Sequence, residues 1–512
     1  MFHQSILISM SITGALGMSS FLIASDEVSA PAHTPVQEDG TDSDRRPNVL
    51  FLAVDDLRPA IAAAGDPLAI TPNLDRLVQS GVMFANAYCQ QAVCHPSRAS
   101  LLTGVRPDTS GIYDLVTPIR DKLPDVVTLP QLFRQSGYHV VGRGKIFHGK
   151  LDDPASWDSA PSEGRTLKGK LYALPENRQP ETPIEEGKPR TRGPAYERAD
   201  VADNTYPDGI LADEAVELLK TLSKNRQPFF LAVGFLKPHL PFCAPAKYWD
   251  LYDREKLWPP PTRCIPPGVP EWTSQPGWEL RNAYQIPNGQ GEPLYEDFEK
   301  TLRHGYYACV SYVDAQIGRV LDALEAEGLD ESTVVVLWGD HGYHVGDMGT
   351  WCKHTNYEVA VHAPLMMRAP GYRGGQVVKR PVEFLDIYPT LAELCHLKVP
   401  EHLEGQSLVP LLQDPNSTAT SGLAFSQYPR GNKEKPLMGY SVRKEQWRYT
   451  EWIRTDAGQV VFRELYDLEG DPHVTRNLAG DPALKPIVEQ LSKLLNRAGA
   501  GVIRARAGHS PD

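Results

Sequence analysis

A cysteine and an arginine lie four positions apart in the run Cys94-His95-Pro96-Ser97-Arg98. Proline is favoured at the first position of a helix, because its missing N–H had no partner there. We therefore expect Cys94 just before a helix N-terminus, where backbone N–H groups and the helix dipole attract anions. Arg98, one turn further on, can reach the same place. This arrangement suits an anionic tetrahedral group held against a nucleophile, although a lone cysteine is more often a small buried apolar residue.

Other charged side chains directly follow predicted strands, where open α/β sheets bind their ligands. We expect the following residues to converge on one edge of a sheet: Asp55, Asp56, Cys94, Lys145, His148, His239, Asp340 and His341. Three carboxylates in one pocket repel each other unless a cation lies among them, and oxygen ligands suit Ca²⁺ or Mg²⁺. Arg98, Lys145 and Lys353 would hold the remaining anionic oxygens. The alternative for the Asp55-Asp56 pair is that it only opens a turn.

The elements that must position these residues are apolar strands alternating with amphipathic helices. The predicted strands cover residues 49–54, 138–141, 229–235, 333–338 and 364–367, and the predicted helices cover 72–78, 129–136, 211–222 and 302–324. This alternation predicts an α/β fold, with a large, mostly parallel sheet and helices on both faces. Beyond about residue 420, three antiparallel strands and a final helix predict a smaller C-terminal α+β subdomain. We expect a catalytic domain over 47–420 and a subdomain over 421–512.

The N-terminus predicts export. Residues 6–23 are mostly apolar and small, and Val28-Ser29-Ala30 resembles a cleavage site, so we expect a signal peptide over 1–30. Residues 31–46 are polar and predict a disordered lead-in. The first residues contain no Lys or Arg, so an uncleaved membrane anchor is the alternative. No other stretch is long and apolar enough to span a bilayer. We expect a periplasmic or secreted protein with no transmembrane span after signal removal.

The overall charge excludes one class of partner. The chain has 64 acidic and 52 basic residues and a formal net charge of −12. A basic surface of the kind that binds nucleic acid is therefore not expected, although a local pocket can still be basic.

The run from Cys94 to Gly104, Cys94-x-Pro96-Ser97-Arg98-x-x-x-x-Thr103-Gly104, resembles the signature of type I sulfatases. The resemblance extends over nearly the whole chain. It is strongest to the iduronate-2-sulfatase branch of that family, within the alkaline phosphatase-like superfamily. The other stretches that carry it are residues 48–59, 90–94, 106–109, 145–148, 229–239, 340–342 and 426–430.

The resemblance implies a mechanism for this site. Cys94 would be oxidised after translation to formylglycine by a formylglycine-generating or other sulfatase-maturating enzyme, and the hydrated aldehyde would be the nucleophile. One calcium ion would be held by residue 94, Asp55, Asp56, Asp340 and His341. Arg98 and Lys145 would brace the nucleophile and the sulfate, His148 would be the base that releases sulfate, and His239 and Lys353 would lie at the ester oxygen.

Two positions depart from the common family pattern. His95 fills a position that is more often small. His341 stands where many sulfatases carry Asn, although the iduronate branch shares the histidine. A histidine nitrogen is an unusual calcium ligand, so a hydrogen bond from His341 to the sulfate is the alternative.

The expected substrate is a sulfated carbohydrate with a nearby carboxylate, such as a 2-O-sulfated uronic acid. Four basic residues are predicted to bind that second anion, namely Arg58, Arg106, Lys237 and His354. The alternative is that they form structural ion pairs with nearby acids. Two long loops, 150–208 and 255–295, match the family poorly and are expected to determine specificity. They could reshape the pocket for another polysaccharide, such as a sulfated galactan or fucan.

Two other functions remain open on the same fold, because fold alone does not decide chemistry. One is a phosphatase or phosphodiesterase, but those relatives use Ser or Thr as nucleophile without the Cys-x-Pro-x-Arg signature. The other is a non-catalytic carbohydrate-binding protein, which the many charged residues of the predicted site argue against.

The seven cysteines are an odd number, which leaves one unpaired in an exported protein. Conversion of Cys94 would leave six, which permits disulfides without requiring them. Cys243 and Cys264 flank a proline-rich loop and are the first pair to test.

Overall fold

The computed structural model describes residues 46–158, 171–178, 193–288 and 292–498. The predicted signal peptide and residues 31–45 of the predicted lead-in lie outside these ranges. From Arg46 onward the chain packs as one unit. Within the described residues, no helix is both long and apolar enough to cross a membrane.

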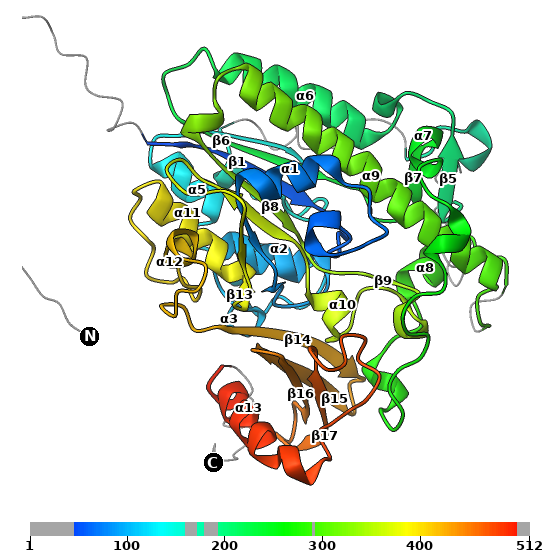
Figure 1. Ribbon diagram of the computed structural model, residues 1–512. Coiled ribbons are helices and arrows are strands. Elements are labelled where there is room, and N and C mark those ends of the chain that lie inside the picture. Colours follow the sequence, from blue (N-terminus) through cyan, green and yellow to red (C-terminus); the bar gives the residue numbers. More distant parts are fainter. Residues whose placement is uncertain (1–45, 159–170, 179–192, 289–291, 499–512) are drawn as a thin grey trace, which may run out of the picture. The chain divides into compact units, whose positions relative to one another are not determined.

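A seven-stranded sheet lies at the centre of this unit, in the order β12-β2-β11-β8-β1-β6-β4 (Figure 1). Its strands are β1 (Asn48–Val54), β2 (Val82–Phe84), β4 (His139–Gly144), β6 (Phe229–Phe235), β8 (Thr333–Gly339), β11 (Leu365–Arg368) and β12 (Gln376–Val378). β1 runs parallel to both β6 and β8, and β4 runs parallel to β6. β11 is antiparallel to its neighbours β8 and β2. The predicted large, mostly parallel sheet is confirmed.

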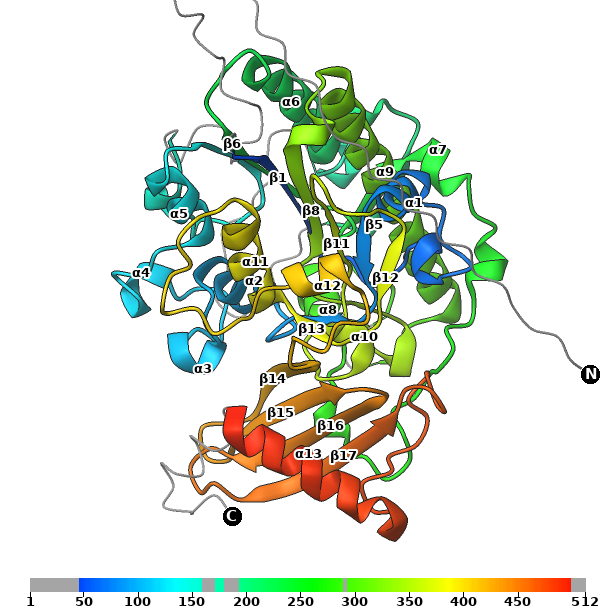
Figure 2. The same cartoon turned by 60° about the vertical axis from the view of Figure 1, so that its left-hand side comes forward.

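Helices cover both faces of the sheet (Figure 2), which explains why β1 is an unbroken apolar run. Leu50, Leu52 and Val54 pack into one apolar cluster with α1 (Pro72–Ser80), α6 (Pro207–Leu222) and α9 (Glu296–Ala326). The alternate β1 residues point to the other face, since side chains alternate along a strand. There they pack with α2 (Cys94–Thr103), α5 (Leu129–Gln135) and α11 (Ile387–Leu394).

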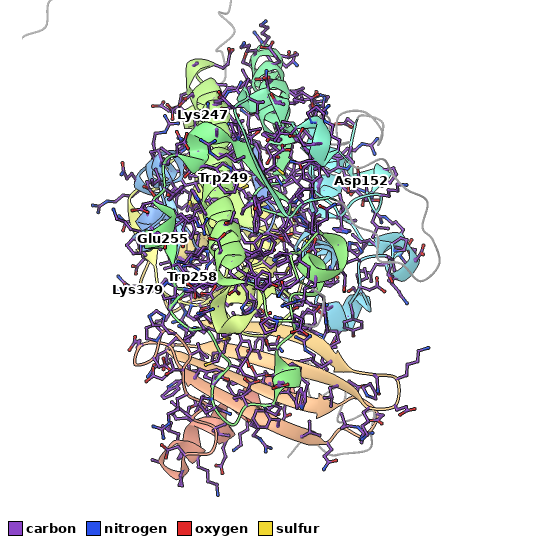
Figure 3. All side chains as sticks on the ribbon, turned by 90° about the vertical axis from the view of Figure 1, so that its right-hand side faces the viewer. Asp152, Lys247, Trp249, Glu255, Trp258 and Lys379 are labelled. Carbon is purple, nitrogen blue, oxygen red and sulfur yellow. The ribbon has the colours of Figure 1, made fainter. Side chains whose placement is uncertain are left out.

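The loop that follows α7 (Ala246–Trp249) packs against α9, and Figure 3 shows this face with Trp249, Glu255 and Trp258 labelled. Lys300 on α9 pairs with Glu255 at 2.8 Å. This contact fixes the start of the long loop over residues 255–295, which later carries α8 (Trp278–Ala283).

The C-terminal part is an antiparallel sheet of four strands in chain order. The strands are β14 (Leu423–Gly431), β15 (Pro436–Lys444), β16 (Trp447–Arg454) and β17 (Val460–Asp467), and α13 (Lys485–Ala498) packs on them. β14 begins two residues after the predicted domain boundary. Its backbone binds the large domain directly, because Gln427 N donates to Gln90 O at 2.8 Å. The predicted second, antiparallel sheet is confirmed.

The cysteine pair singled out for testing, Cys243 and Cys264, is not bonded. All seven cysteines are free. Cys243 is fully buried in β7 (Phe242–Pro245), whereas Cys264 is exposed on the loop. One sulfur in the core and one at the surface do not meet.

A buried ion pair joins the C-terminal sheet to the large domain. Arg448 on β16 donates to Glu358, the first residue of α10 (Glu358–Val361), at 2.6 Å. Burial raises the pKa of Glu358, but the cations Arg448 and Arg443 outweigh it and lower that pKa from 4.5 to about 2. A depressed carboxyl pKa stabilises the fold above the unfolded pKa, and this contribution is lost as pH falls from 4.5 towards 2.

We expect Glu358→Gln to lower the free energy of unfolding at pH 7 by about 3–5 kcal/mol, because Arg448 is left buried without its carboxylate. The difference from wild type should shrink as the pH falls through the ordinary glutamate pKa. Urea unfolding at neutral pH and at two acidic pH values measures both effects. A difference that stays constant over this range would show that the Glu358 charge does not stabilise the fold.

Candidate active site

The two aspartates after β1 and the Asp-His pair after β8 meet because these strands are neighbours in register, with Val54 opposite Gly339. Asp340 Oδ1 accepts a hydrogen bond from the backbone N–H of Asp56 at 2.9 Å. Asp56 has a φ of 61°, in the left-handed region that non-glycine residues seldom adopt. Such backbone strain is concentrated at functional sites. The structure therefore brings the ends of β1 and β8 together, as the sequence predicts.

Cys94 is the first residue of α2, with Val93 as the N-cap. Pro96 is thus the third helical residue, and the expectation that it would be the first was wrong by two positions. The Cys94 Sγ atom lies 3.4 Å from His341 Nε2 and 3.8 Å from Asp56 Oδ1. Burial, together with the negative charge of Asp55, raises the pKa of the Cys94 thiol well above its ordinary value. An unmodified thiol here stays protonated and is a poor nucleophile.

Arg98 binds two of the aspartates. Its Nε donates to Asp340 Oδ2 at 2.9 Å and its Nη2 donates to Asp55 Oδ1 at 3.0 Å. Lys145 Nζ donates to the other Asp55 oxygen at 2.5 Å. Burial raises the pKa of Asp55, but Lys145, His239 and Arg98 outweigh it and hold that pKa well below its ordinary value. The Asp55 carboxylate is therefore ionised and fixed in place by buried cations.

Lys353 and His239 lie beside Asp56. Lys353 Nζ is 2.9 Å from both oxygens of Asp56, and His239 Nε2 is 3.9 Å from Asp56 Oδ2. Both side chains also contact Glu279 on α8, at 2.8 Å for Lys353 and 3.1 Å for His239. Sequence reasoning missed Glu279. A single glutamate in a long loop matches no motif, and the only signal was the expectation that this loop takes part in binding.

His148 completes the predicted set. Its Nδ1 atom is buried and has no hydrogen-bond partner among the described residues. Burial and the neighbouring Lys145 lower the pKa of His148 to about 3. The ring is 6.0 Å from that of His95, whose Nε2 lies 2.7 Å from the carbonyl oxygen of Thr117. His148 is therefore neutral near pH 7.

The donor atoms fit a hard divalent cation. Two overlapping groups of possible ligands share Cys94: one adds Asp55, Asp56 and His239, and the other adds Asp340 and His341. Within each group the ligand atoms all lie within 4.8 Å of one another. Buried carboxylate oxygens are the ligands that Ca²⁺ and Mg²⁺ prefer. His341 directs Nε2 to within 3.3 Å of Asp56 Oδ1, while its Nδ1 faces the carbonyl of Gly342 at 2.8 Å.

Three of the four residues predicted to bind a second anion have partners inside the protein. Arg58 pairs with Asp347 at 2.6 Å. Lys237 Nζ donates to the carbonyl oxygens of His239 and Pro241. We therefore do not assign Arg58 or Lys237 to substrate binding. The contact of Arg58 with Asp347 is a structural ion pair, which was the alternative prediction.

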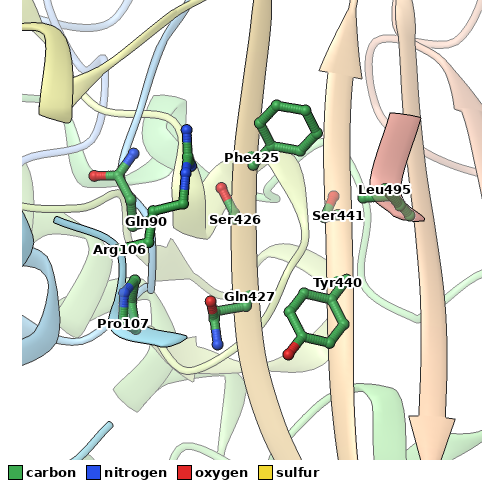
Figure 4. A pocket seen from close by; sticks show the side chains of 9 residues that line it. All are labelled: Gln90, Arg106, Pro107, Phe425, Ser426, Gln427, Tyr440, Ser441 and Leu495. Carbon is green, nitrogen blue, oxygen red and sulfur yellow. The ribbon is translucent and has the colours of Figure 1, made fainter. Parts of the chain in front are cut away.

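Arg106 is equally occupied. It donates to both oxygens of Glu383, at 2.7 and 2.6 Å. Figure 4 shows it beside Gln90 and facing β14, in a cavity of about 10 Å³ that has the size of one water molecule. This cavity is too small for a sugar.

His354 is the fourth of these residues, and it lies beside Trp278. Its side chain is half-buried, and its Nδ1 has no hydrogen-bond partner among the described residues. The His354 ring is 6.3 Å from that of Trp278. Of the four predicted residues, we keep only His354 as a candidate for binding substrate.

Helices cover both faces of the sheet, and aspartates, basic side chains and a helix N-terminus lie together at its strand ends. This arrangement is that of an alkaline phosphatase-like hydrolase. Residues 47–397 match the family model described as Sulfatase, and residues 346–500 match the one described as N-sulphoglucosamine sulphohydrolase, C-terminal. The chain belongs to the sulfatase family, and the protein is a hydrolase of sulfate esters.

Two sequence relatives agree with this assignment, and a solved structure shares the fold. Iduronate 2-sulfatase of Mus musculus is 33% identical, over 85% of this chain and 91% of that protein. A protein described as Sulfatase from Formosa agariphila is 36% identical, over 89% of this chain and 87% of its own length. Among solved structures, the phosphonate monoester hydrolase SpPMH from Silicibacter pomeroyi has a TM-score of 0.70 and 25% identity, covering 90% of this chain and 96% of that one.

Proposed function

We propose that the protein removes sulfate from a sulfated carbohydrate, with formylglycine at position 94 as nucleophile and one bound Ca²⁺. The substrate we favour is a 2-O-sulfated uronic acid. The observation that carries the proposal is the position of Cys94, at the first residue of α2 and within 3.8 Å of both His341 and Asp56.

Formylglycine fits position 94. The first turn of α2 has backbone N–H groups free to attract the anionic sulfate. The buried thiol would itself be protonated and unreactive. When the residue is converted, its hydrated aldehyde supplies an oxygen nucleophile at this place.

Asp55, Asp56, Asp340 and residue 94 would hold the calcium ion. The ion supplies positive charge that polarises the sulfate oxygens. His341 Nε2 faces the same space, either as a further ligand or as a hydrogen-bond donor to the sulfate. Arg98 and Lys145 keep the Asp55 carboxylate ionised and oriented.

His239 and Lys353 would act at the ester oxygen. A sugar alcohol is a poor leaving group, so its oxygen needs a proton or a cation as the bond to sulfur breaks. Both residues offer N–H groups beside Asp56. His148, neutral and with no partner for Nδ1 in the described part of the chain, would accept a proton when sulfate is released.

A groove of about 1010 Å³ supports a carbohydrate substrate. It lies between the loop at 263–278 and β14, and Trp278, Tyr428 and Arg430 line it. Trp278 directly precedes Glu279, so the groove adjoins the side of the site where His239 and Lys353 lie. The guanidinium of Arg430 stacks 4.6 Å from the Tyr428 ring and donates to carbonyl oxygens such as that of Trp272. The exposed ring of Trp278 and a cation held by neutral partners suit an acidic sugar.

We expect a 2-O-sulfated uronate disaccharide to be desulfated with a kcat/KM about tenfold or more above that of a neutral sulfated galactose disaccharide, a difference of about 1.4 kcal/mol. The panel should include sulfated algal oligosaccharides, an aryl sulfate and a phosphonate monoester. Preference for neutral sulfated sugars would overturn the uronate assignment and leave the sulfatase chemistry intact. Preference for the phosphonate, the substrate class of the relative from Silicibacter pomeroyi, would overturn the sulfate assignment.

We also propose that the protein is exported and that a maturating enzyme of its host converts Cys94. The apolar segment at residues 6–23 and the following Val28-Ser29-Ala30 support export.

A further inference from the structure

Glu279 is an acidic residue beside the site that the motifs of the sequence do not include. It lies on α8, in the loop over 255–295, and its side chain is 17% exposed. One oxygen, Oε1, is 3.1 Å from His239 Nε2, and the other, Oε2, is 2.8 Å from Lys353 Nζ. A single carboxylate therefore contacts both groups that the proposed function assigns to the leaving oxygen.

The partners of the two ring nitrogens of His239 determine its protonation. Its Nδ1 lies 2.6 Å from the carbonyl oxygen of Leu240, and a carbonyl oxygen can only accept. Its Nε2 faces the ionised carboxylate of Glu279, which also can only accept. Both ring nitrogens therefore carry hydrogen, and the Nε2 hydrogen lies between Glu279 and the space beside Asp56.

The loop that carries Glu279 is held rigidly to the segment of Lys353. Gln275 Nε2 donates to the carbonyl oxygens of Trp351 and Lys353 at 2.6 and 2.8 Å. Gln275 Oε1 accepts from the backbone N–H of Gly277 at 2.6 Å and of Trp278 at 2.9 Å, at the start of α8. These hydrogen bonds of Gln275 hold α8 in place and so restrict the position of the Glu279 carboxylate, as an active site requires.

We propose that Glu279 is a positioning residue for leaving-group departure: it holds His239 and Lys353 together against the ester oxygen. The proposal rests on the proposed function. As the bond from sulfur to the sugar oxygen breaks, that oxygen takes the bonding electron pair and the Nε2 proton of His239. Sulfur forms its new bond to the nucleophilic hydroxyl oxygen, whose own proton leaves to solvent, and a proton from solvent later restores His239. Glu279 keeps the Nε2–H group of His239 directed at the ester oxygen throughout, and Glu279 itself neither gives nor takes a proton.

The test compares esters whose leaving groups differ. Glu279→Gln puts an amide N–H₂ against one of two N–H donors, so it cannot accept from both. For a sulfated sugar we expect kcat to fall by about 30- to 100-fold, a part of the roughly 10²- to 10⁴-fold that a well-placed general acid contributes. For 4-nitrophenyl sulfate, whose phenolate leaves without a proton, we expect a change of less than about threefold. KM should change little for either ester.

Glu292→Gln is the matched control, since Glu292 lies in the same loop, is exposed and is outside the groove. It should leave both rates within about twofold of wild type, as surface substitutions usually do. Thermal unfolding of each variant checks that the fold is kept. Equal losses on the two esters, or a change in KM alone, would show that Glu279 is merely structural and would overturn the proposal.

A double-mutant cycle separates this inference from the proposed function. In a His239→Ala background, Glu279→Gln should cost the sugar sulfate at least about tenfold less than in wild type, because residues that act together are not additive. Full additivity would contradict the proposal. If His239→Ala itself has equal effects on both esters, the leaving-group role of His239 is wrong, and the proposed function fails at that point rather than at Glu279.

Discussion

Cys94→Ala is expected to lower kcat on any sulfate ester by about 10⁵- to 10⁶-fold, as for removal of other enzymes' nucleophiles. Alanine cannot be converted to an aldehyde, so the nucleophile would be missing from the start of α2. The fold should survive, because alanine has the highest helix propensity and is smaller than cysteine. Steady-state rates with a sulfated disaccharide and with 4-nitrophenyl sulfate measure the loss.

Cys309→Ala is the matched control for this change. Cys309 is also fully buried within a helix, α9, and it belongs to neither group of possible metal ligands. It should keep turnover within about threefold while costing some stability through the small cavity it leaves. If Cys94→Ala kept more than a small fraction of wild-type turnover, position 94 would not carry the nucleophile.

Asp55→Asn is expected to give the second large effect, on metal content, activity and stability together. Asp55 pairs with Arg98 at 3.0 Å and with Lys145 at 2.5 Å. An amide leaves Lys145 without its counter-charge and removes one of the two carboxylates that pair with Arg98, which should lower the free energy of unfolding by about 3–5 kcal/mol. Loss of a charged ligand should also release the divalent ion and reduce kcat by about 10²- to 10³-fold. Elemental analysis, kinetics and urea unfolding of the purified protein measure these quantities.

Asp314→Asn separates metal binding from general destabilisation. Asp314 is also a buried aspartate, and it accepts hydrogen bonds from backbone N–H groups at the start of α1, with Leu74 N at 2.8 Å. This variant should lose stability but retain the ion. Wild-type protein without a near-stoichiometric divalent cation, or Asp55→Asn with its ion retained, would contradict the calcium site.

The central strands and the charged residues at their ends could be predicted from the sequence. β1, β6 and β8 contain the unbroken apolar runs 49–54, 229–233 and 334–338, because both faces of the sheet are covered, and these runs are easy to recognise in the sequence. The carboxyl ends of parallel strands lie at the same edge of a sheet. The sequence pattern alone was therefore enough to predict that Asp55 and Asp340 lie close together. The antiparallel course of β11 could not be predicted, since a buried strand has the same apolar pattern in either direction.

Contacts between residues far apart in the sequence were the main features that could not be predicted from the sequence. Arg58 and its partner Asp347 are 289 positions apart, so no local pattern indicated that this arginine was already paired. Glu279 was missed for the same reason, because its partners His239 and Lys353 come from two other segments. The position of Pro96 was predicted from a preference for the first helical residue, but the helix begins two residues earlier.

The identity of residue 94 in active protein tests the account most directly. Peptide mass spectrometry should be performed on protein made with and without a maturating enzyme, and the fraction carrying an aldehyde in place of the CH₂–SH group compared with kcat on a sulfated disaccharide. We predict that kcat rises in proportion to that fraction and falls to background where residue 94 is entirely cysteine. Full turnover from protein in which residue 94 is wholly unmodified cysteine would contradict the account.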